Sequence, residues 1–162
     1  MSTERTSFMT LALAEAERAG ERGEVPVGAV LVDGVTGAVL AAAGNRIEAL
    51  ADPTSHAEML VLRAGASARS AARLDDCDLY VTLEPCAMCA GAASLARVAR
   101  IVFAADDPKG GAVLHGPRFF EQPTCHHRPT IARAGDADAV SRLLKGFFQT
   151  IRASGRVPRT SA

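Results

Sequence analysis

The chain has 162 residues, 48% of them hydrophobic, and its 18 basic residues balance 18 acidic ones. This length suits one globular domain with a sizeable core, and the composition excludes an intrinsically disordered chain. The charge balance excludes a surface that is basic all over, but not a local basic patch. No signal peptide and no membrane-spanning apolar run is evident, so we expect a cytoplasmic protein whose four cysteines stay reduced.

Hydrophobic periodicity predicts helices and strands in the order α-β-β-α-β-α-β-α. In chain order these are a helix over 6–19 that Gly20 and Gly23 end, strands over 26–32 and 38–43, a helix after residue 54, a strand over 79–83, a helix over 86–97, a strand over 100–104 and a helix over 136–152. This order predicts an α/β fold, a mixed sheet with helices on both faces.

The helix expected after residue 54 opens on Ser55, His56, Ala57 and Glu58. Ser55 and Glu58 have the spacing of a capping box, in which each side chain bonds the other's backbone N–H group. The apolar face would then come from Met59, Leu60 and Leu62. On this interpretation His56 is an incidental surface residue, and the alternative is that His56 and Glu58 begin an active site.

A second segment, "LEPCAMCAGA", favours the active site. Cys86 and Cys89 are three positions apart on a helix that Pro85 is expected to open, so both thiols share a face. The first turn of a helix also favours the thiolate form that binds metals. With His56 they give three ligands suited to zinc and leave a fourth position open for water, as in catalytic zinc sites.

Other interpretations of these cysteines stay open. A lone C-x-x-C also suits half of a structural zinc site or a redox pair. Candidates for a fourth ligand are Cys77, Cys125, His126 and His127, although none has a tight ligand spacing. Glu58 would gain a role beside a catalytic zinc, because a carboxylate there can carry a proton from water to a substrate nitrogen.

H-x-E followed by P-C-x-x-C resembles the signature of zinc-dependent deaminases of the cytidine deaminase fold. The whole chain from about residue 6 to 152 is similar to the bacterial tRNA-specific adenosine deaminases. The similar segments are EVPVGAV (24–30), GNR (44–46), DPTSHAE (52–58), LYVTLEPCAMCAGA (79–92), RIVFAADDPKGGA (100–112), HHR (126–128) and LLKGFF (143–148).

The resemblance implies a three-layer α-β-α fold with a central mixed five-stranded sheet. It implies a deaminase domain over 1–152 and leaves a short basic tail over 153–162. It also implies one Zn²⁺ per chain, held by His56, Cys86 and Cys89, with Glu58 as the general acid/base. The substrate pocket would involve Asn45, which contacts the nucleoside, Pro26 and Val27 as an apolar wall, and backbone groups around Ala57, Glu84 and Pro85.

The activity that the resemblance implies is hydrolytic deamination of adenosine to inosine at the wobble position of a tRNA anticodon stem-loop, by a homodimer. A small-molecule deaminase acting on guanine, cytosine or a free nucleoside is the alternative, and a non-catalytic zinc module is a third possibility. Glu58 counts against the module, because a structural zinc needs a fourth ligand rather than a base. The segment 110–129 departs from the family pattern, which weighs on the substrate more than on the chemistry.

Asn45 and the basic C-terminal segment also have simpler, structural explanations. Without the family, Asn45 would be interpreted as a turn residue after a strand. From Arg142 onward there are five basic residues and no acidic ones, so the rest of the chain carries a net charge of −5 (0 − 5). Such a tail suits either a phosphate-binding arm or a solvated end.

Overall fold

A five-stranded sheet with strand order β2-β1-β3-β4-β5 forms the middle of the molecule. The structure is a computed structural model, and it describes residues 2–156. Its elements are α1 (Ser2–Glu21), β1 (Gly28–Asp33), β2 (Val39–Gly44), α2 (Ile47–Leu50), α3 (Ala57–Arg69), β3 (Cys77–Leu83), α4 (Ala87–Ala96), β4 (Arg100–Ala105), the 3₁₀ turn η1 (Phe119–Glu121), β5 (Thr130–Arg133) and α5 (Ala137–Ala153).

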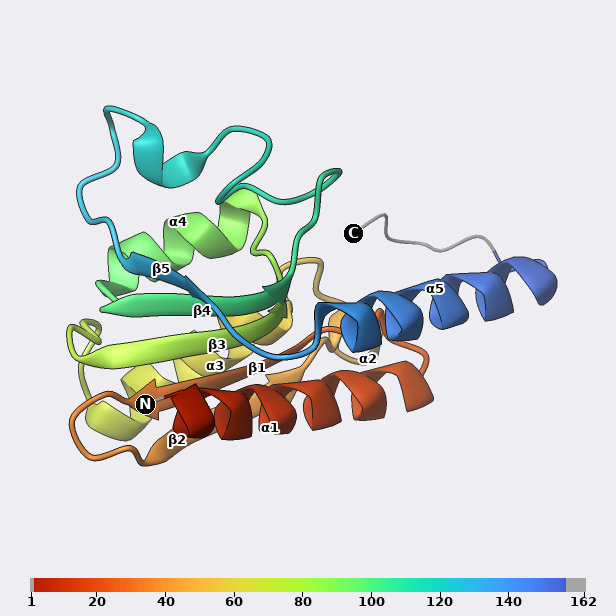
Figure 1. The fold of residues 1–162 in the computed structure, drawn as a ribbon, viewed down its shortest axis with the longest axis horizontal. Helices are drawn as coiled ribbons and strands as arrows, with labels where there is room; N and C mark the ends of the chain where they lie inside the picture. The colour runs from red at the N-terminus through yellow and green to blue at the C-terminus, as the bar shows by residue number, and fades with distance from the viewer. Residues whose placement is uncertain (1, 157–162) are drawn as a thin grey trace.

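The strands alternate their side chains between two hydrophobic cores. In β1, Ala29 and Leu31 face one core and Val30 and Val32 face the other. Helices α3 and α4 cover the first face, and α1 and α5 cover the second (Figure 1). The predicted three-layer α-β-α arrangement is therefore confirmed. Gly28 lets α1 approach this closely, since a Cβ there would lie 1.9 Å from the Ala12 carbonyl oxygen.

The direction of the strands brings distant segments to one edge of the sheet. β1 is antiparallel to both β2 and β3, and β3, β4 and β5 are mutually parallel, so the sheet is mixed as predicted. Consequently β2, β3 and β4 all end at the same edge. The residues that follow these three ends, beginning with Asn45, Glu84 and Asp106, are therefore neighbours in space.

The shortest elements were not predicted from the sequence. Helix α2 has only 4 residues, and β5, also 4 residues, lies inside a stretch with no apolar alternation. Helix α1 runs through Gly20 to Glu21, and α4 begins at Ala87 rather than at Pro85. Pro85 precedes the N-cap residue, where its fixed backbone still suits a helix start.

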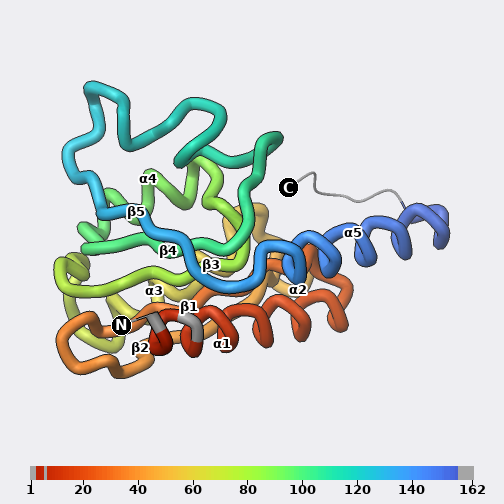
Figure 2. The backbone as a smooth tube through the Cα atoms, viewed as in Figure 1, coloured from red at the N-terminus to blue at the C-terminus, as the bar shows by residue number. Residues whose placement is uncertain are grey.

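The C-terminal helix reaches beyond the sheet. The last turns of α5 extend past the other elements, and only its first part packs against β3 and β4 (Figure 2). Part of the expected tail, residues 157–162, lies outside the described residues. Between residues 2 and 156, no helix is long and apolar enough to cross a membrane.

Candidate metal centre

Two helices begin side by side at the edge where β2 and β3 end. His56 is the N-cap residue of α3, and Cys86 is the N-cap residue of α4. Cys89 lies one turn further along α4 and is fully buried. The positive ends of both helix dipoles thus point at the same small volume, which favours thiolates there.

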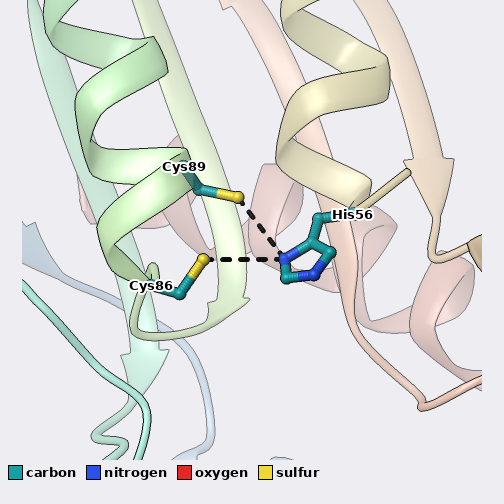
Figure 3. Close-up of side chains that lie close together, drawn as sticks. All are labelled: His56, Cys86 and Cys89. Atoms are coloured by element: carbon teal, nitrogen blue, oxygen red, sulfur yellow. Dashed lines mark hydrogen bonds between the residues drawn. The ribbon is translucent and has the colours of Figure 1, made fainter. Parts of the chain in front are cut away.

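The three predicted ligands converge (Figure 3). His56 Nδ1 lies 3.7 Å from Cys86 Sγ and 3.6 Å from Cys89 Sγ, and all three atoms lie within 4.8 Å of one another. A tetrahedral zinc with ordinary Zn–N and Zn–S bonds holds its nitrogen and sulfur ligands roughly 3.5 Å apart. The three side chains therefore fit zinc without rearrangement, and within residues 2–156 they are the group that could hold a metal ion.

The contacts among the two thiols and the imidazole shift the pKa of each group. Hydrogen bonds from Cys89 and from the His56 ring outweigh burial and lower the pKa of Cys86 to about 4. The same contacts raise the pKa of His56 and of Cys89. A divalent cation would bind both sulfurs as thiolates and the ring as neutral imidazole. Its binding would therefore release the protons that these groups carry without metal.

Glu58 is buried beside the cluster with one oxygen unsatisfied. The residue is 3% exposed, and its Oε2 has no hydrogen-bond partner among the described residues. Burial raises the pKa of Glu58 to about 7, while the charge of His56 opposes that rise. Buried polar atoms in native proteins are nearly always hydrogen-bonded, so we expect this oxygen to bond a group that enters the site.

The predicted capping box is wrong. The Ser55 hydroxyl donates to Asp52 Oδ2 at 2.8 Å, and His56 is the N-cap residue instead of Ser55. Glu58 is committed to the cluster and does not reach back to the helix start. The apolar face also differs from expectation, because Val61 and Leu62 are buried while the predicted Met59 and Leu60 are only partly so.

The side chain that caps α3 comes from Asn45. Its Oδ1 accepts the backbone N–H of Ala57 at 2.9 Å, between His56 and Glu58 in the sequence. Asn45 is itself buried, and its own N–H donates to the Val27 carbonyl. The residue is therefore more than a turn residue: it is attached to the first turn of the helix that carries the predicted ligand and acid/base.

Glu84 organises the segment on the other side of the cluster. Its side chain is buried, and its two oxygens accept the backbone N–H groups of Asp107, Val113, Leu114 and His115 and the ring of His115. Burial opposes ionisation, but these donors together lower the pKa of Glu84. Ala112 N also donates to the Pro85 carbonyl, so the loop is fastened directly beside Cys86. Gly111 permits this contact, because a Cβ there would lie 2.5 Å from Glu84 Cδ.

Pro26 and Val27 are both buried in the segment before β1. Pro26 also lines a groove of about 1580 Å³ between the end of α1 and α5. None of the three ligand candidates lines that groove, so the groove is not the space between them.

The other cysteines and histidines lie elsewhere. Cys77 begins β3 at the opposite edge of the sheet, and burial raises its pKa to about 11. Cys125 is buried against Ser94 and donates to the His127 carbonyl, and the His127 ring contacts the Val98 carbonyl. His126 is exposed. These contacts attach the 122–128 loop to α4, and they leave His56, Cys86 and Cys89 as the candidate set.

The sequence analysis does not identify His115, whose ring nitrogen Nδ1 lies 2.8 Å from Glu84 Oε2. The two residues are 31 positions apart, so no local spacing marks the pair.

Removing a ligand should remove the metal. We expect His56→Ala, Cys86→Ala and Cys89→Ala each to lose most of about one zinc per chain, because two ligands bind zinc weakly. Cys77→Ala and Cys125→Ala are the matched controls and should keep full zinc, measured as metal per protein by atomic emission. Full zinc content in Cys89→Ala would refute the ligand set, and metal loss in either control would reveal a missed ligand.

Comparison with known proteins agrees with this geometry. The family described as the cytidine and deoxycytidylate deaminase zinc-binding region matches residues 2–105. A tRNA-specific adenosine deaminase from Agrobacterium fabrum is 53% identical over 149 residues, which is 92% of this chain and 97% of that protein.

The solved structures that resemble this chain are also deaminases. One, from a study of A-to-I editing by tRNA:A34 deaminases at the wobble position of transfer RNA, is 57% identical with a TM-score of 0.78 and covers 81% of this chain and 99% of its own. A guanine deaminase from Bacillus subtilis is 27% identical with a TM-score of 0.60, covering 96% of each chain. The chain therefore belongs to the zinc-binding cytidine and deoxycytidylate deaminase family and, within it, to the tRNA-specific adenosine deaminases.

Proposed function

We propose that this protein hydrolyses adenosine to inosine at the wobble position of tRNA and releases ammonia. The observation that carries the proposal is the meeting of His56, Cys86 and Cys89 with a buried, half-satisfied Glu58. Three ligands and a free carboxylate suit hydrolysis, whereas a purely structural zinc would use a fourth protein ligand. The identity of 53% to a tRNA-specific adenosine deaminase supports the choice of substrate.

Each of the four residues has one role in this reaction. His56, Cys86 and Cys89 would hold zinc, which when bound supplies a Lewis acid that makes water a nucleophile at neutral pH. Glu58 takes a proton from the attacking water and delivers it to the ring nitrogen of the base. It then carries the second proton to the departing amine, so that water and adenosine give inosine and ammonia.

The substrate pocket is proposed to lie between the segments that follow β2 and β3. Because Asn45 Oδ1 is occupied by the Ala57 N–H, its amide NH₂ is the group left to donate to the nucleoside. The buried Pro26 and Val27 supply an apolar wall, and backbone groups at Ala57, Glu84 and Pro85 border the opening. The Glu84 carboxylate is fully used by the loop and acts on the substrate only through that loop.

The RNA is proposed to contact α5. Three basic side chains of α5, Arg142, Lys145 and Arg152, are exposed, and so is Arg156, which follows the helix. We assign residues 1–152 to the deaminase domain and 153–162 to a basic tail that continues this surface, with an anticodon stem-loop as the partner. Arg159 of that tail lies outside the described residues.

A homodimer in the cytoplasm completes the proposal. Leu95 of α4 is 82% exposed and would be available for contact in such a dimer. A free-base deaminase is the second candidate, supported by the likeness to guanine deaminase. The identity to that guanine deaminase is 27%, against 57% to the structure from the study of tRNA:A34 deaminases, which favours the RNA substrate.

Replacing Glu58 tests the acid/base role. Glu58→Gln keeps the size of the side chain but cannot carry a proton, so we expect deamination to fall by at least ~10²-fold. Zinc content and the circular dichroism spectrum should match the wild type, which separates lost chemistry from lost structure. Near-normal turnover by the variant would show that Glu58 is not the proton carrier.

The RNA surface predicts a salt-dependent interaction. We expect wild-type affinity for an anticodon stem-loop to fall steeply with salt, because each phosphate contact releases a counterion. The triple variant Arg152→Gln, Arg156→Gln, Arg159→Gln should lower that salt slope by about two units, in line with lost phosphate contacts. Zinc content should not change.

Arg73→Gln is the matched control, because Arg73 is an exposed arginine at the opposite edge of the sheet. It should leave the slope at the wild-type value. An unchanged slope in the triple variant would remove α5 from the RNA surface. Rapid ammonia release from a free base, with no turnover of the stem-loop at any salt, would favour the second candidate.

A further inference from the structure

Glu24 is a buried carboxylate that lies outside the metal centre and outside every role assigned above. It is 3% exposed and follows the end of α1, where its own N–H donates to the Ala19 carbonyl at 2.9 Å. A buried charge is costly unless strong donors satisfy it. The donors that satisfy this one therefore indicate what Glu24 is placed to hold.

Those donors are the backbone amides of the second and third residues of α2. Glu24 Oε1 accepts from Ala49 N at 2.8 Å, and Oε2 accepts from Glu48 N at 3.2 Å. Helix α2 has 4 residues, and its own N-cap residue, Arg46, supplies no side-chain cap. A helix this short is not stable alone, so its position depends on the carboxylate that replaces its cap.

Helix α2 begins directly after the segment that carries Asn45. Asn45 is 5% exposed, its carbonyl accepts Arg22 Nη2 at 3.2 Å, and its side chain caps α3 at Ala57. Arg46 N in turn donates to the Ser55 carbonyl, just before His56. A continuous series of hydrogen bonds, called here the series of caps, thus runs from Glu24 through α2 and Asn45 to the first turn of α3.

We propose that Glu24 is a positioning residue for Asn45, and through it for the nucleoside end of the site. Glu24 touches neither the ligand set nor Glu58. It fixes α2, so that the Asn45 amide is held with its Oδ1 on Ala57 and its NH₂ group toward substrate. This inference rests on the proposed function, because it assigns Glu24 to substrate binding in that same site.

The kinetic test compares binding with chemistry. Glu24→Ala should raise the KM for an anticodon stem-loop roughly tenfold, the scale of a lost helix cap, and change kcat by less than about threefold. Glu24→Gln keeps one acceptor oxygen and should have an intermediate KM. Glu48→Ala is the matched control, since it removes a neighbouring exposed carboxylate and keeps the amide that Glu24 binds. Its KM should equal the wild-type value, and a purely structural Glu24 would leave KM unchanged.

A double-mutant cycle separates action through Asn45 from independent action. If Glu24 acts through Asn45, then adding Glu24→Ala to Asn45→Ala should change KM by less than about twofold. A further tenfold rise in the double variant would show that the two residues act independently, and would overturn the proposal.

Amide exchange tests the series of caps without any activity. In ¹⁵N-labelled protein, Glu24→Gln should increase hydrogen exchange at the Ala49 and Ala57 amides, whereas Glu48→Ala should not. Unchanged exchange at Ala57 in Glu24→Gln would also overturn the proposal, and this variant serves if Glu24→Ala does not fold. If the wild type deaminates no stem-loop, the proposed function fails, while the exchange result still decides whether Glu24 holds Asn45.

Discussion

The meeting of two helix N-termini at one edge of the sheet is the constraint on which the site depends. β2, β3 and β4 end at that edge, and α3 and α4 begin there with His56 and Cys86 as their N-cap residues. Two positive dipole ends so close together stabilise negative charge between them. The thiolates of Cys86 and Cys89 supply that negative charge, and the same sulfurs would attract and hold a cation beside Glu58.

The N-cap residue of α3 is the candidate ligand His56, and that of α2 is Arg46, and neither side chain caps its own helix. The capping side chains come from elsewhere in the chain. Asn45 caps α3, Glu24 caps α2, and Glu84 accepts the amides of the 107–115 loop. Each of these groups is buried, so its bonds face little competition from water. The segments that border the site are held by polar contacts that cross from one element to another, whereas the two hydrophobic cores lie on the two faces of the sheet.

The sequence predicted the parts of this arrangement that have local signals. The main helices and strands were predicted from hydrophobic periodicity. The candidate ligands were predicted from the spacing of Cys86 and Cys89, together with His56. β5 and α2 were missed because four residues show no periodicity. The capping box failed because Glu58 belongs to the buried cluster, a competition that no local pattern reveals. The bond between His115 and Glu84 joins positions 31 residues apart, and only the fold brings them together.

One zinc is expected to join the starts of α3 and α4 through two sulfurs and one imidazole. X-ray absorption at the zinc edge of the purified protein measures this directly. The spectrum should fit two sulfur ligands near ~2.3 Å, one imidazole nitrogen and one further light atom near ~2.0 Å. Three or four sulfurs would bring Cys77 or Cys125 into the site and contradict the account, as would a shell without sulfur.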